Sequence, residues 1–302
     1  MCTKKTARAA LAVLLVLTLA APLVAAMADV PVQTETVTVT ETQAAAAETV
    51  AESVAVEPTQ TYNIRVDGVA MTQDPVVTYV NGIAYVAVRP VAQALDPQVE
   101  ATWDGKTATL VHWGVVSLTA TPGMSYVVAN DRCLYVPDQV MGQNGAVLIP
   151  LDVLCKVFDA TYYAHEDGSF DLFTGSGALA YGSEFYDSDD LYWLSHIINA
   201  ESGNQPLSGK IAVGNVVLNR TQDSRFPDTV YGVIYQKNQF TPAATGSVNK
   251  APNAESISAA KLCLDGAVAL DDVLWFNQAG LRCWAARNRP FVATIAGHSF
   301  YA

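Results

Sequence analysis

The sequence predicts an α+β protein with two folded domains, a small module built from a repeat and a second domain rich in helical patterns. Its 302 residues are enough for about two domains by the usual length prior. Residues 61–175 carry the same succession of strand, short helix, strand, turn and strand twice, whereas residues 183–302 contain long apolar segments with helical periodicity. With 51% hydrophobic residues, the chain can bury a core in each domain.

The charge balance excludes one class of partner. There are 17 basic and 29 acidic residues, a formal net charge of −12. A protein that binds nucleic acid usually presents a basic stripe to the phosphates, so we expect no nucleic acid partner.

Residues 1–28 resemble an export signal. Lys4, Lys5 and Arg8 precede an apolar run over residues 9–24, and Ala26-Met27-Ala28 fits an A-x-A cleavage site. An uncleaved anchor is the alternative, because the uncharged run over residues 9–28 is about long enough to span a bilayer. Either way the signal predicts a secreted or cell-wall-associated protein at the cell envelope surface.

Residues 29–60 are predicted to be an acidic, disordered linker. The segment has no aromatic residue and no Lys or Arg, and it carries six acidic residues. Such a composition cannot bury enough apolar surface to offset the entropy lost on ordering.

Four cysteines follow the signal, and an exported protein can oxidise them. The spacing favours the pairs Cys133–Cys155 and Cys263–Cys283, each of which would lie within one domain. Free buried thiols are the alternative. None of the four lies beside a His or a glycine-rich turn, so a catalytic cysteine is not expected.

The repeat lies within residues 61–175. Its copies cover residues 83–110 and 146–173, and the turns Asp104-Gly105 and Asp167-Gly168 each separate alternating apolar runs, which predicts two hairpins. This pattern resembles the copper amine oxidase N-terminal-like domain, a small α+β module, and the resemblance implies a spacer or wall-contacting role. We expect no copper site, because His112 and His165 occur singly.

Glu201 is the residue on which the second domain's interpretation depends. On a helical wheel it falls in the middle of an apolar half formed by Leu191, Trp193, Leu194, Ile197, Ile198 and Ala200. Burial and the negative end of the helix dipole would both raise its pKa, as a general acid near neutral pH requires. Alternatively, Glu201 could cap a backbone group or pair with a basic residue. His196 lies opposite Glu201 on the wheel and should face solvent.

The remaining elements are assigned from breakers and periodicity. Ser188 is a plausible N-cap for the Glu201 helix, which should end at Ser202-Gly203-Asn204. The later expectations are an apolar central helix over 206–220, a short helix after an Asp228 N-cap, a loop over 239–242, a helix over 255–270, and extended segments over 273–277 and 291–301.

Six segments in unbroken order carry a second resemblance. They are residues 199–203 (Asn-Ala-Glu-Ser-Gly), 209–220, 226–230, 233–235, 239–241 and 298–301 (His-Ser-Phe-Tyr). Together they resemble the spore-cortex-lytic, SleB-like cell wall hydrolase family. That family implies a mostly helical lysozyme or lytic-transglycosylase-like domain over 183–302, which cleaves the peptidoglycan glycan strand, with its catalytic glutamate at Glu201.

The chain departs from the family's pattern at one informative position. Many members continue Glu-Ala-Arg-Gly-Glu, whereas this sequence reads Glu201-Ser202-Gly203-Asn204-Gln205. Ordinary glycosidases need two carboxyl groups, but a lytic transglycosylase can use one as acid and then as base. We therefore expect a lytic transglycosylase acting between N-acetylmuramic acid and N-acetylglucosamine. The rivals are a hydrolytic muramidase using a distant base such as Asp223, and an inactive wall-binding protein.

Further residues are candidates for binding the sugar. Gln239, Phe240 and Thr241 belong to one quoted segment, and polar side chains there could bind N-acetyl or hydroxyl groups. Asn277 could orient an acetamido group, and His298 could line the cleft or instead hold the C-terminus by a hydrogen bond. Tyr301, like Phe276 and Trp284, could stack on a sugar, although such aromatics usually belong to the core. We expect no metal, no cofactor and a monomer.

Overall fold

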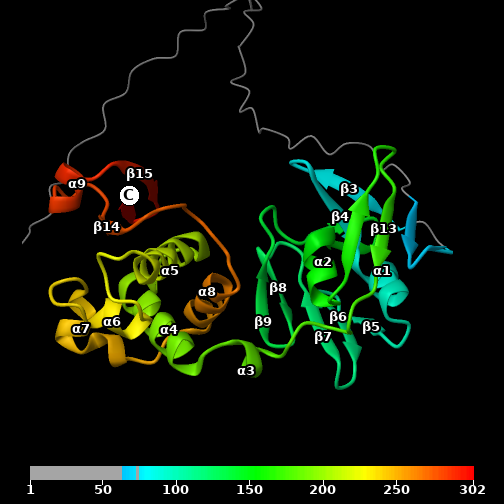
Figure 1. Cartoon of the computed structure of the whole chain (residues 1–302), viewed down its shortest axis with the longest axis horizontal. Coiled ribbons are helices and arrows are strands. Elements are labelled where there is room, and N and C mark those ends of the chain that lie inside the picture. The colour runs from blue at the N-terminus through cyan, green and yellow to red at the C-terminus, as the bar shows by residue number, and fades with distance from the viewer. Residues whose placement is uncertain (1–62, 73–74) are drawn as a thin grey trace, which may run out of the picture. The chain divides into compact units, whose positions relative to one another are not determined.

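The computed structural model describes residues 63–72 and 75–302 (Figure 1). The predicted signal and the acidic linker lie outside these residues. Within the described ranges, no helix combines the length and the apolar character that crossing a membrane requires. The described part mixes helices and strands, and its N-terminal region is rich in sheet, as the α+β prediction requires.

Three sheets form the N-terminal module. One has the order β12-β13-β1-β2, in which β1 pairs with β13 in parallel, so the module's first and last strands lie side by side. The second has the order β10-β11-β4-β3, and the third is the meander β5-β6-β7-β8-β9. The strands are β1 (Ile64–Val66), β2 (Val69–Ala70), β3 (Val77–Val80), β4 (Ile83–Ala87), β5 (Glu100–Trp103), β6 (Ala108–His112), β7 (Val116–Ala120), β8 (Tyr126–Ala129), β9 (Arg132–Tyr135), β10 (Met141–Gln143), β11 (Ala146–Pro150), β12 (Thr161–Ala164) and β13 (Phe170–Phe173).

The two stretches read as copies have the same order of elements. β4 leads into α1 (Val88–Leu95) and then the hairpin β5-β6, while β11 leads into α2 (Leu151–Val157) and then the hairpin β12-β13. Gly105 and Gly168 have φ values of 94° and 85°, which a residue without a Cβ adopts freely in a tight turn. Both predicted hairpins are therefore confirmed. β4 and β11 pair antiparallel, with Val86 opposite Ile149, and this pairing joins the two stretches.

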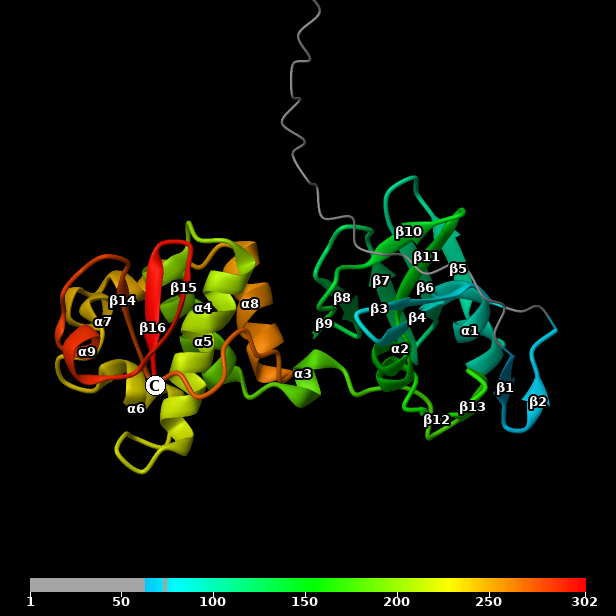
Figure 2. The same ribbon diagram turned by 90° about the horizontal axis from the view of Figure 1, so that it is seen from above.

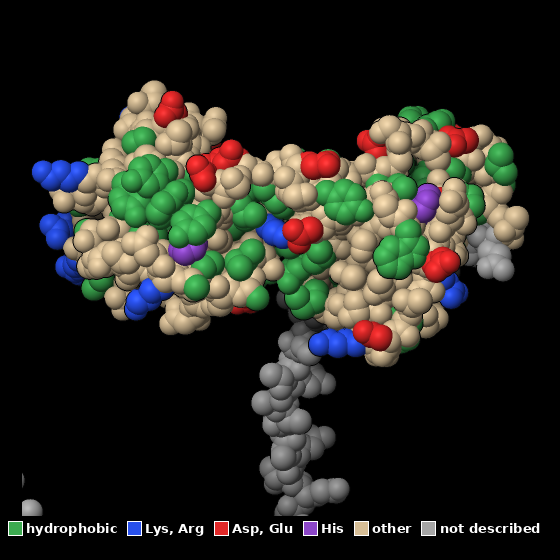
Figure 3. All heavy atoms as spheres, turned by 90° about the horizontal axis from the view of Figure 1, so that it is seen from below, with side chains coloured by type: hydrophobic (Ala, Val, Ile, Leu, Met, Phe, Trp, Pro, Cys, Tyr) green, Lys and Arg blue, Asp and Glu red, His purple; other side chains and the backbone are tan. Residues whose placement is uncertain are grey.

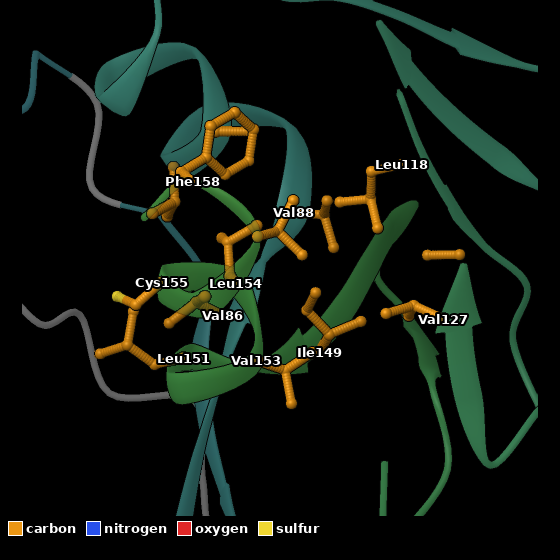
Figure 4. Close-up of a cluster of buried hydrophobic side chains, with 14 of the residues drawn as sticks. Val86, Val88, Leu118, Val127, Ile149, Leu151, Val153, Leu154, Cys155 and Phe158 are labelled. Carbon is orange, nitrogen blue, oxygen red and sulfur yellow. The ribbon is translucent and has the colours of Figure 1, made fainter. Parts of the chain in front are cut away.

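Figure 4 shows how this module buries its apolar side chains. Leu154 of α2 lies beside Val86 of β4, and Leu118 and Val127 lie on the side of the meander sheet. Leu118, Leu154 and Val86 are completely buried. The short helices thus fill the space between sheets that would otherwise expose their apolar faces.

The C-terminal domain is built around three helices that pack against one another, α4, α5 and α8 (Figures 1 and 2). A three-stranded sheet of order β14-β16-β15 lies beside them. The elements are α3 (Gly182–Phe185), α4 (Ser188–Ser202), α5 (Leu207–Gln222), α6 (Val230–Tyr235), α7 (Thr241–Thr245), a 3₁₀ turn (Ser247–Asn249), α8 (Ala254–Leu264), β14 (Trp275–Gln278), α9 (Trp284–Asn288), β15 (Phe291–Ile295) and β16 (His298–Tyr301).

Helix α5 is buried almost all round, which agrees with the apolar sequence read as a central helix. Residues 209–217 are all buried. Gly214 allows the close approach, because a Cβ there would lie 2.6 Å from Cys263 Sγ in α8 and 3.0 Å from Ile198 Cδ1 in α4. The other side of α4 is more open. Tyr192 on α4 and Tyr231 on α6 are exposed, and hydrophobic side chains gather on the face of this domain seen in Figure 3.

Several expected boundaries are corrected by the local hydrogen bonds. Asp187 caps α4 in place of Ser188, since its carboxylate accepts bonds from the N–H groups of the first helical turn. Thr229 caps α6 in place of Asp228, and its Oγ accepts from Gly232 N at 3.1 Å. The expected loop over 239–242 runs into helix α7, and α8 ends at Leu264 because Gly266 adopts a φ of 94°.

His196 was expected to face solvent, and this prediction is wrong. Its side chain is 6% exposed, and its Nδ1 lies 2.8 Å from the carbonyl oxygen of Val248. Its ring also stacks on Tyr192 at 4.1 Å. The helical wheel predicted that the face of α4 opposite Glu201 is exposed to solvent, but the 3₁₀ turn packs on this face and covers the imidazole ring.

The predicted disulfides are also wrong, because all four described cysteines are free thiols. Burial raises the pKa of Cys133 to about 11 and that of Cys155 to about 12, so both are inert, protonated side chains at neutral pH. Cys263 packs against α5, and Cys283 instead caps α9 by accepting a bond from Ala286 N. The alternative prediction, buried free thiols, is correct for Cys133, Cys155 and Cys263.

The close contact at Gly214 gives a test of the helical core. Gly214→Ala should lower the free energy of unfolding by about 1 to 3 kcal/mol, because the new methyl group meets Cys263 Sγ. The double variant Gly214→Ala/Cys263→Ala should recover most of this loss, and urea unfolding measures both. Gly209→Ala is the matched control, since its Cβ would meet nothing closer than 3.3 Å. Equal losses at both glycines would contradict the packing argument.

Candidate active site

A pocket of about 500 Å³ opens in the C-terminal domain where the end of α4 meets the three-stranded sheet. Its walls come from segments that are distant in sequence: the α4–α5 turn, the end of α5, the start of α7, β14 and the turn before β16. The lining residues are Glu201, Gln205, Arg220, Gln239, Phe240, Thr241, Phe276, Asn277, Gln278, Gly297 and His298.

Glu201 lies in the last turn of α4 and is partly buried. Leu194, Ile197 and Ile198 on the same helix are completely buried, so the apolar half of the wheel does face the core. Burial raises the pKa of Glu201 above its ordinary value of 4.5, and no neighbouring charge contributes. In the described part of the chain, no hydrogen bond or ion pair engages its carboxyl group. In this structure Glu201 therefore neither caps a backbone group nor pairs with a basic residue, which were the alternative interpretations.

The residues around Glu201 hold the end of α4 in place. Asn199 Oδ1 accepts from Asn253 N at 3.1 Å, which ties this end to the start of α8. Ser202 is fully buried, and its Oγ donates to Ile198 O at 2.7 Å. A Cβ at Gly203 would lie 2.5 Å from Asn199 O, so only glycine fits there. The segment Asn-Ala-Glu-Ser-Gly therefore positions Glu201 by packing and hydrogen bonds.

Gln205 joins two walls of the pocket. Its Oε1 accepts a hydrogen bond of 2.9 Å from Gly297 N in the turn before β16. Its backbone carbonyl accepts from Lys210 Nζ, and the same ammonium group pairs with Glu255 at 2.6 Å. Lys210 is 1% exposed, so this pair is buried on its cationic side. Position 205 is thus occupied by a neutral side chain with a positioning contact.

Helix α5 holds the segment that leads into β14 by three polar side chains on one face. Asn215 Nδ2 donates to Ala267 O at 2.9 Å, and Asn219 Nδ2 donates to Val273 O at 3.0 Å. Arg220 Nε donates to Leu274 O at 2.8 Å. These bonds satisfy carbonyl groups that would otherwise be buried without partners. They also fix where β14, and hence one pocket wall, begins.

Two enclosed nitrogen atoms of the pocket residues have no hydrogen-bond partner in the described structure, Arg220 Nη1 and His298 Nδ1. Arg220 is 4% exposed and faces the rings of Phe226 and Phe240, and burial lowers its pKa to about 10, so it remains a cation. Burial lowers the pKa of His298, which favours its neutral form. Such unpaired groups are available to a ligand.

Most of the predicted site residues come together here. Glu201, Gln239, Phe240, Thr241, Asn277 and His298 all line the pocket. Tyr301 does not; it is 6% exposed, pairs with Trp275 across β14 and β16, and packs edge-on against Phe291 at 5.9 Å. The free Nδ1 of His298 also argues against a clasp on the C-terminus.

Sequence analysis did not predict Arg220, Gln278 and Gly297 as lining residues. It considered Gln205 only as the position that lacks a second carboxylate, and Phe276 as a core residue that could instead stack on a sugar. The sequence could have indicated Arg220, because an arginine within an apolar helix is rarely buried unless it has a partner or a function. Gln278 and Gly297 had no local signal, since the pairing of Gln278 with His298 across the sheet brings them to the pocket.

Glu201 is the one carboxyl group among the described residues that line the pocket. Asp223, the base considered for a hydrolase, is not in the lining. Arg225 forms an ion pair with it at 2.6 Å, and hydrogen bonds from Arg225 lower the pKa of Asp223 to about 2. A carboxylate held this way is a poor base.

No metal centre is evident in the part of the chain that the structure describes: no group of three or more His, Cys, Asp or Glu is placed to hold an ion there. In the N-terminal module, His112 lies 2.6 Å from Asp96 and His165 lies 2.7 Å from Asp171. Each histidine thus has a single carboxylate partner.

Two family models match the chain. Residues 204–301 match the Cell Wall Hydrolase family, and residues 64–169 match the Copper amine oxidase N-terminal domain. Both resemblances read from the sequence are therefore confirmed. Glu201 lies just before the first matched range.

The curated relatives are spore cortex-lytic enzymes. Those of Oceanobacillus iheyensis and Bacillus cereus are each 30% identical over 116 residues, which is 38% of this chain and 42% and 45% of theirs. That of Bacillus subtilis is 28% identical over 116 residues, 38% of each chain. The chain thus matches less than half the length of each of these relatives.

Two solved structures are also similar. They are the catalytic domain of the germination-specific lytic transglycosylase SleB from Bacillus anthracis and the catalytic domain of the Bacillus cereus SleB protein. Each is 27% identical to this chain, with a TM-score of 0.37. The similarity covers all of each solved structure and 41% and 42% of this chain, respectively.

The buried carboxyl group predicts a pH-dependent cost to stability. Its folded pKa is raised, so the unfolded chain loses this proton first as the pH rises above 4.5. Wild-type stability should therefore fall relative to Glu201→Gln as the pH rises from 4.5 through the folded pKa, and the difference between the two proteins should be constant at lower pH. Urea unfolding of both proteins across this range measures the difference. Glu184→Gln, at an exposed position on α3, is the control and should follow wild type; a Glu201→Gln profile parallel to wild type would contradict the burial argument.

Proposed function

We propose that the C-terminal domain is a peptidoglycan lytic transglycosylase that cleaves the glycan strand between N-acetylmuramic acid and N-acetylglucosamine, with Glu201 as its catalytic carboxyl group. The observation that supports this most is a single, partly buried carboxyl group of raised pKa at a pocket lined by polar and aromatic side chains. The cell wall hydrolase match and the spore cortex-lytic relatives support the same substrate.

Glu201 acts first as an acid. Its raised pKa keeps a proton on the carboxyl group nearer to neutral pH, and it gives this proton to the glycosidic oxygen as the bond to muramic acid C1 breaks. N-acetylglucosamine leaves with a free 4-hydroxyl group. The muramic acid ring is left with positive charge shared between C1 and the ring oxygen.

Glu201 then acts as a base. As a carboxylate it takes the proton of the 6-hydroxyl group of the same muramic acid, whose oxygen bonds to C1. The nucleophile is already part of the substrate, so the reaction gains the advantage of an intramolecular step and needs no second carboxylate to activate water. The products are a 1,6-anhydromuramic end and a restored, protonated Glu201.

The other lining residues are proposed to hold the sugar. Gln239 and Thr241 offer hydrogen-bonding groups, and Phe240 forms an apolar wall. Asn277, whose Nδ2 donates to Gln278 O and Leu281 O, offers the remaining lone pair of its Oδ1. His298, which burial keeps neutral, offers an unpartnered Nδ1 to a hydroxyl or amide group of the strand. An aromatic wall with a few convergent polar groups is the usual composition of a small-ligand site.

We also propose that the protein works outside the cytoplasm, at or in the wall, as its substrate and the sequence of residues 1–28 suggest. The module over residues 61–175 would then act as a spacer or contact the wall.

The product of the reaction tests the proposal. Mature wild-type protein incubated with purified peptidoglycan should release fragments whose muramic ends are lighter by one water than reducing ends, as measured by mass spectrometry. Glu201→Gln should lower the release at least a hundredfold, since general acid catalysis contributes about that much or more. Glu184→Gln is the matched control and should keep full activity.

Each other outcome has a distinct meaning. Ordinary reducing ends would show that water attacks and would favour a hydrolytic muramidase. No release from several kinds of wall, with binding to sacculi retained in Glu201→Gln, would overturn the enzyme and leave a wall-binding protein.

Gln205→Glu offers a second test, because it restores a carboxyl group at the pocket without removing the acceptor for Gly297 N. A second negative charge there should raise the pKa of Glu201 further. The alkaline limb of the pH–rate profile should move to higher pH while the anhydro product persists. An unmoved limb would contradict the pocket's electrostatics, and a change to reducing ends would show that this position can activate water.

A further inference from the structure

We propose that the segment around α9 forms a carboxylate-binding platform beside the pocket, and that it binds the peptide stems of the glycan strand. The platform consists of Trp275, Trp284, Arg282, Arg287 and Arg289. The inference rests on the proposed function for the identity of the strand, and it assigns a role to residues that the cleavage step does not use.

Arg289 is the centre of the platform. Its guanidinium carbon lies 4.1 Å from the centre of the Trp275 ring and 5.0 Å from that of Trp284. The two indole rings are themselves 6.2 Å apart. Arg289 Nε is enclosed and has no hydrogen-bond partner in the described structure. Aromatic contacts thus hold the guanidinium group in one place while part of its hydrogen-bonding capacity stays unused.

The positive charge of this segment is not balanced nearby. Residues 281–290 contain three arginines and no acidic residue, although the whole chain has a net charge of −12. Among the described residues, no carboxylate forms an ion pair with Arg282, Arg287 or Arg289, whereas Arg65, Arg132 and Arg225 each have an aspartate partner. Arg287 Nη2 donates to the backbone carbonyl oxygen of Arg282 at 2.9 Å, which holds the Arg287 guanidinium group next to the start of this segment.

The platform is continuous with the pocket through β14. Trp275 is the first residue of β14, and the next three residues of this strand, Phe276, Asn277 and Gln278, all line the pocket. Cys283 Sγ donates to Asn277 Oδ1 at 3.0 Å, which fixes the start of α9 against the same residue. Figures 1 and 2 both show α9 next to β14. A ligand that fills the pocket therefore has the platform as its neighbour.

The chemistry of the strand identifies the occupant. Where muramic acid carries a peptide stem, the sugars of the glycan strand are uncharged, because its lactyl carboxyl group forms the amide bond to the stem, and the free carboxylates lie on the stems. Arginine binds carboxylates by paired, charge-assisted hydrogen bonds. The exposed indole of Trp284, 57% accessible, also offers a flat apolar surface to the strand. A stem next to the cleaved bond thus fits a cluster of unpaired guanidinium groups beside the pocket.

Two substrates that differ only in their stems test the platform. One is soluble glycan strands that carry peptide stems, and the other is the same strands after an amidase has removed the stems and the lactyl carboxyl groups that this frees on muramic acid have been converted to amides. Arg282→Gln/Arg287→Gln should lower kcat/KM on stem-bearing strands about tenfold, mainly through KM, and leave kcat/KM on stripped strands unchanged. The variant should also weaken the dependence of KM on salt.

The matched control removes the same charge elsewhere. Arg89→Gln/Lys250→Gln changes two exposed positions, one in α1 and one after the 3₁₀ turn, and should behave as wild type on both substrates. An equal loss on stripped strands, or the same loss in the control, would overturn the platform, and so would an unchanged KM on stem-bearing strands.

A binding measurement separates this inference from the proposed reaction. In the Glu201→Gln background, calorimetry should show tighter binding of stem-bearing than of stripped strands, and Arg282→Gln/Arg287→Gln should abolish the difference. This result would support the platform even if wild type cleaved neither substrate, a finding that would overturn the proposed function alone. Equal affinity of the Glu201→Gln protein for the two kinds of strand would overturn the platform even if cleavage were efficient.

Discussion

The placement of one carboxyl group among apolar side chains is the constraint on which the rest of the C-terminal domain depends. Glu201 follows the buried residues Ile197 and Ile198 on α4, and nothing in the described structure neutralises it or binds it. Burying such a group costs stability, so the surrounding helices must supply the packing that offsets it. The close approach of α5 and α8 at Gly214 is part of that packing.

Helix α5 links this packing to the geometry of the pocket. Its apolar sides fill the core, while Asn215, Asn219 and Arg220 bind the backbone carbonyls of the segment that enters β14. The wall opposite Glu201 is therefore set by side chains of the same helix against which α4 packs. Core and site share one element, and a substitution in α5 would disturb both.

Local patterns predicted what depends on nearby residues. The helix of Glu201, the apolar α5, both module hairpins and six of the lining residues followed from periodicity, turn chemistry and the quoted segments. His196 and the cysteines were misjudged because their surroundings come from distant parts of the chain, and Tyr301, for which a core position was the alternative, does not line the pocket for the same reason. The 3₁₀ turn over His196 and the sheet around Tyr301 are tertiary contacts, which no helical wheel or strand pattern contains. The hydrogen bond between Gln205 and Gly297 was missed for the same reason.

The bond between Gln205 and Gly297 joins residues that are 92 positions apart. Contacts of such long range form late, because most of the intervening chain must be ordered before its ends can meet. A molecule whose helices have formed but whose last strands have not docked would have Glu201 without an enclosing pocket. The carboxyl group would then acquire its full burial, and the raised pKa that burial causes, only when the last strands dock.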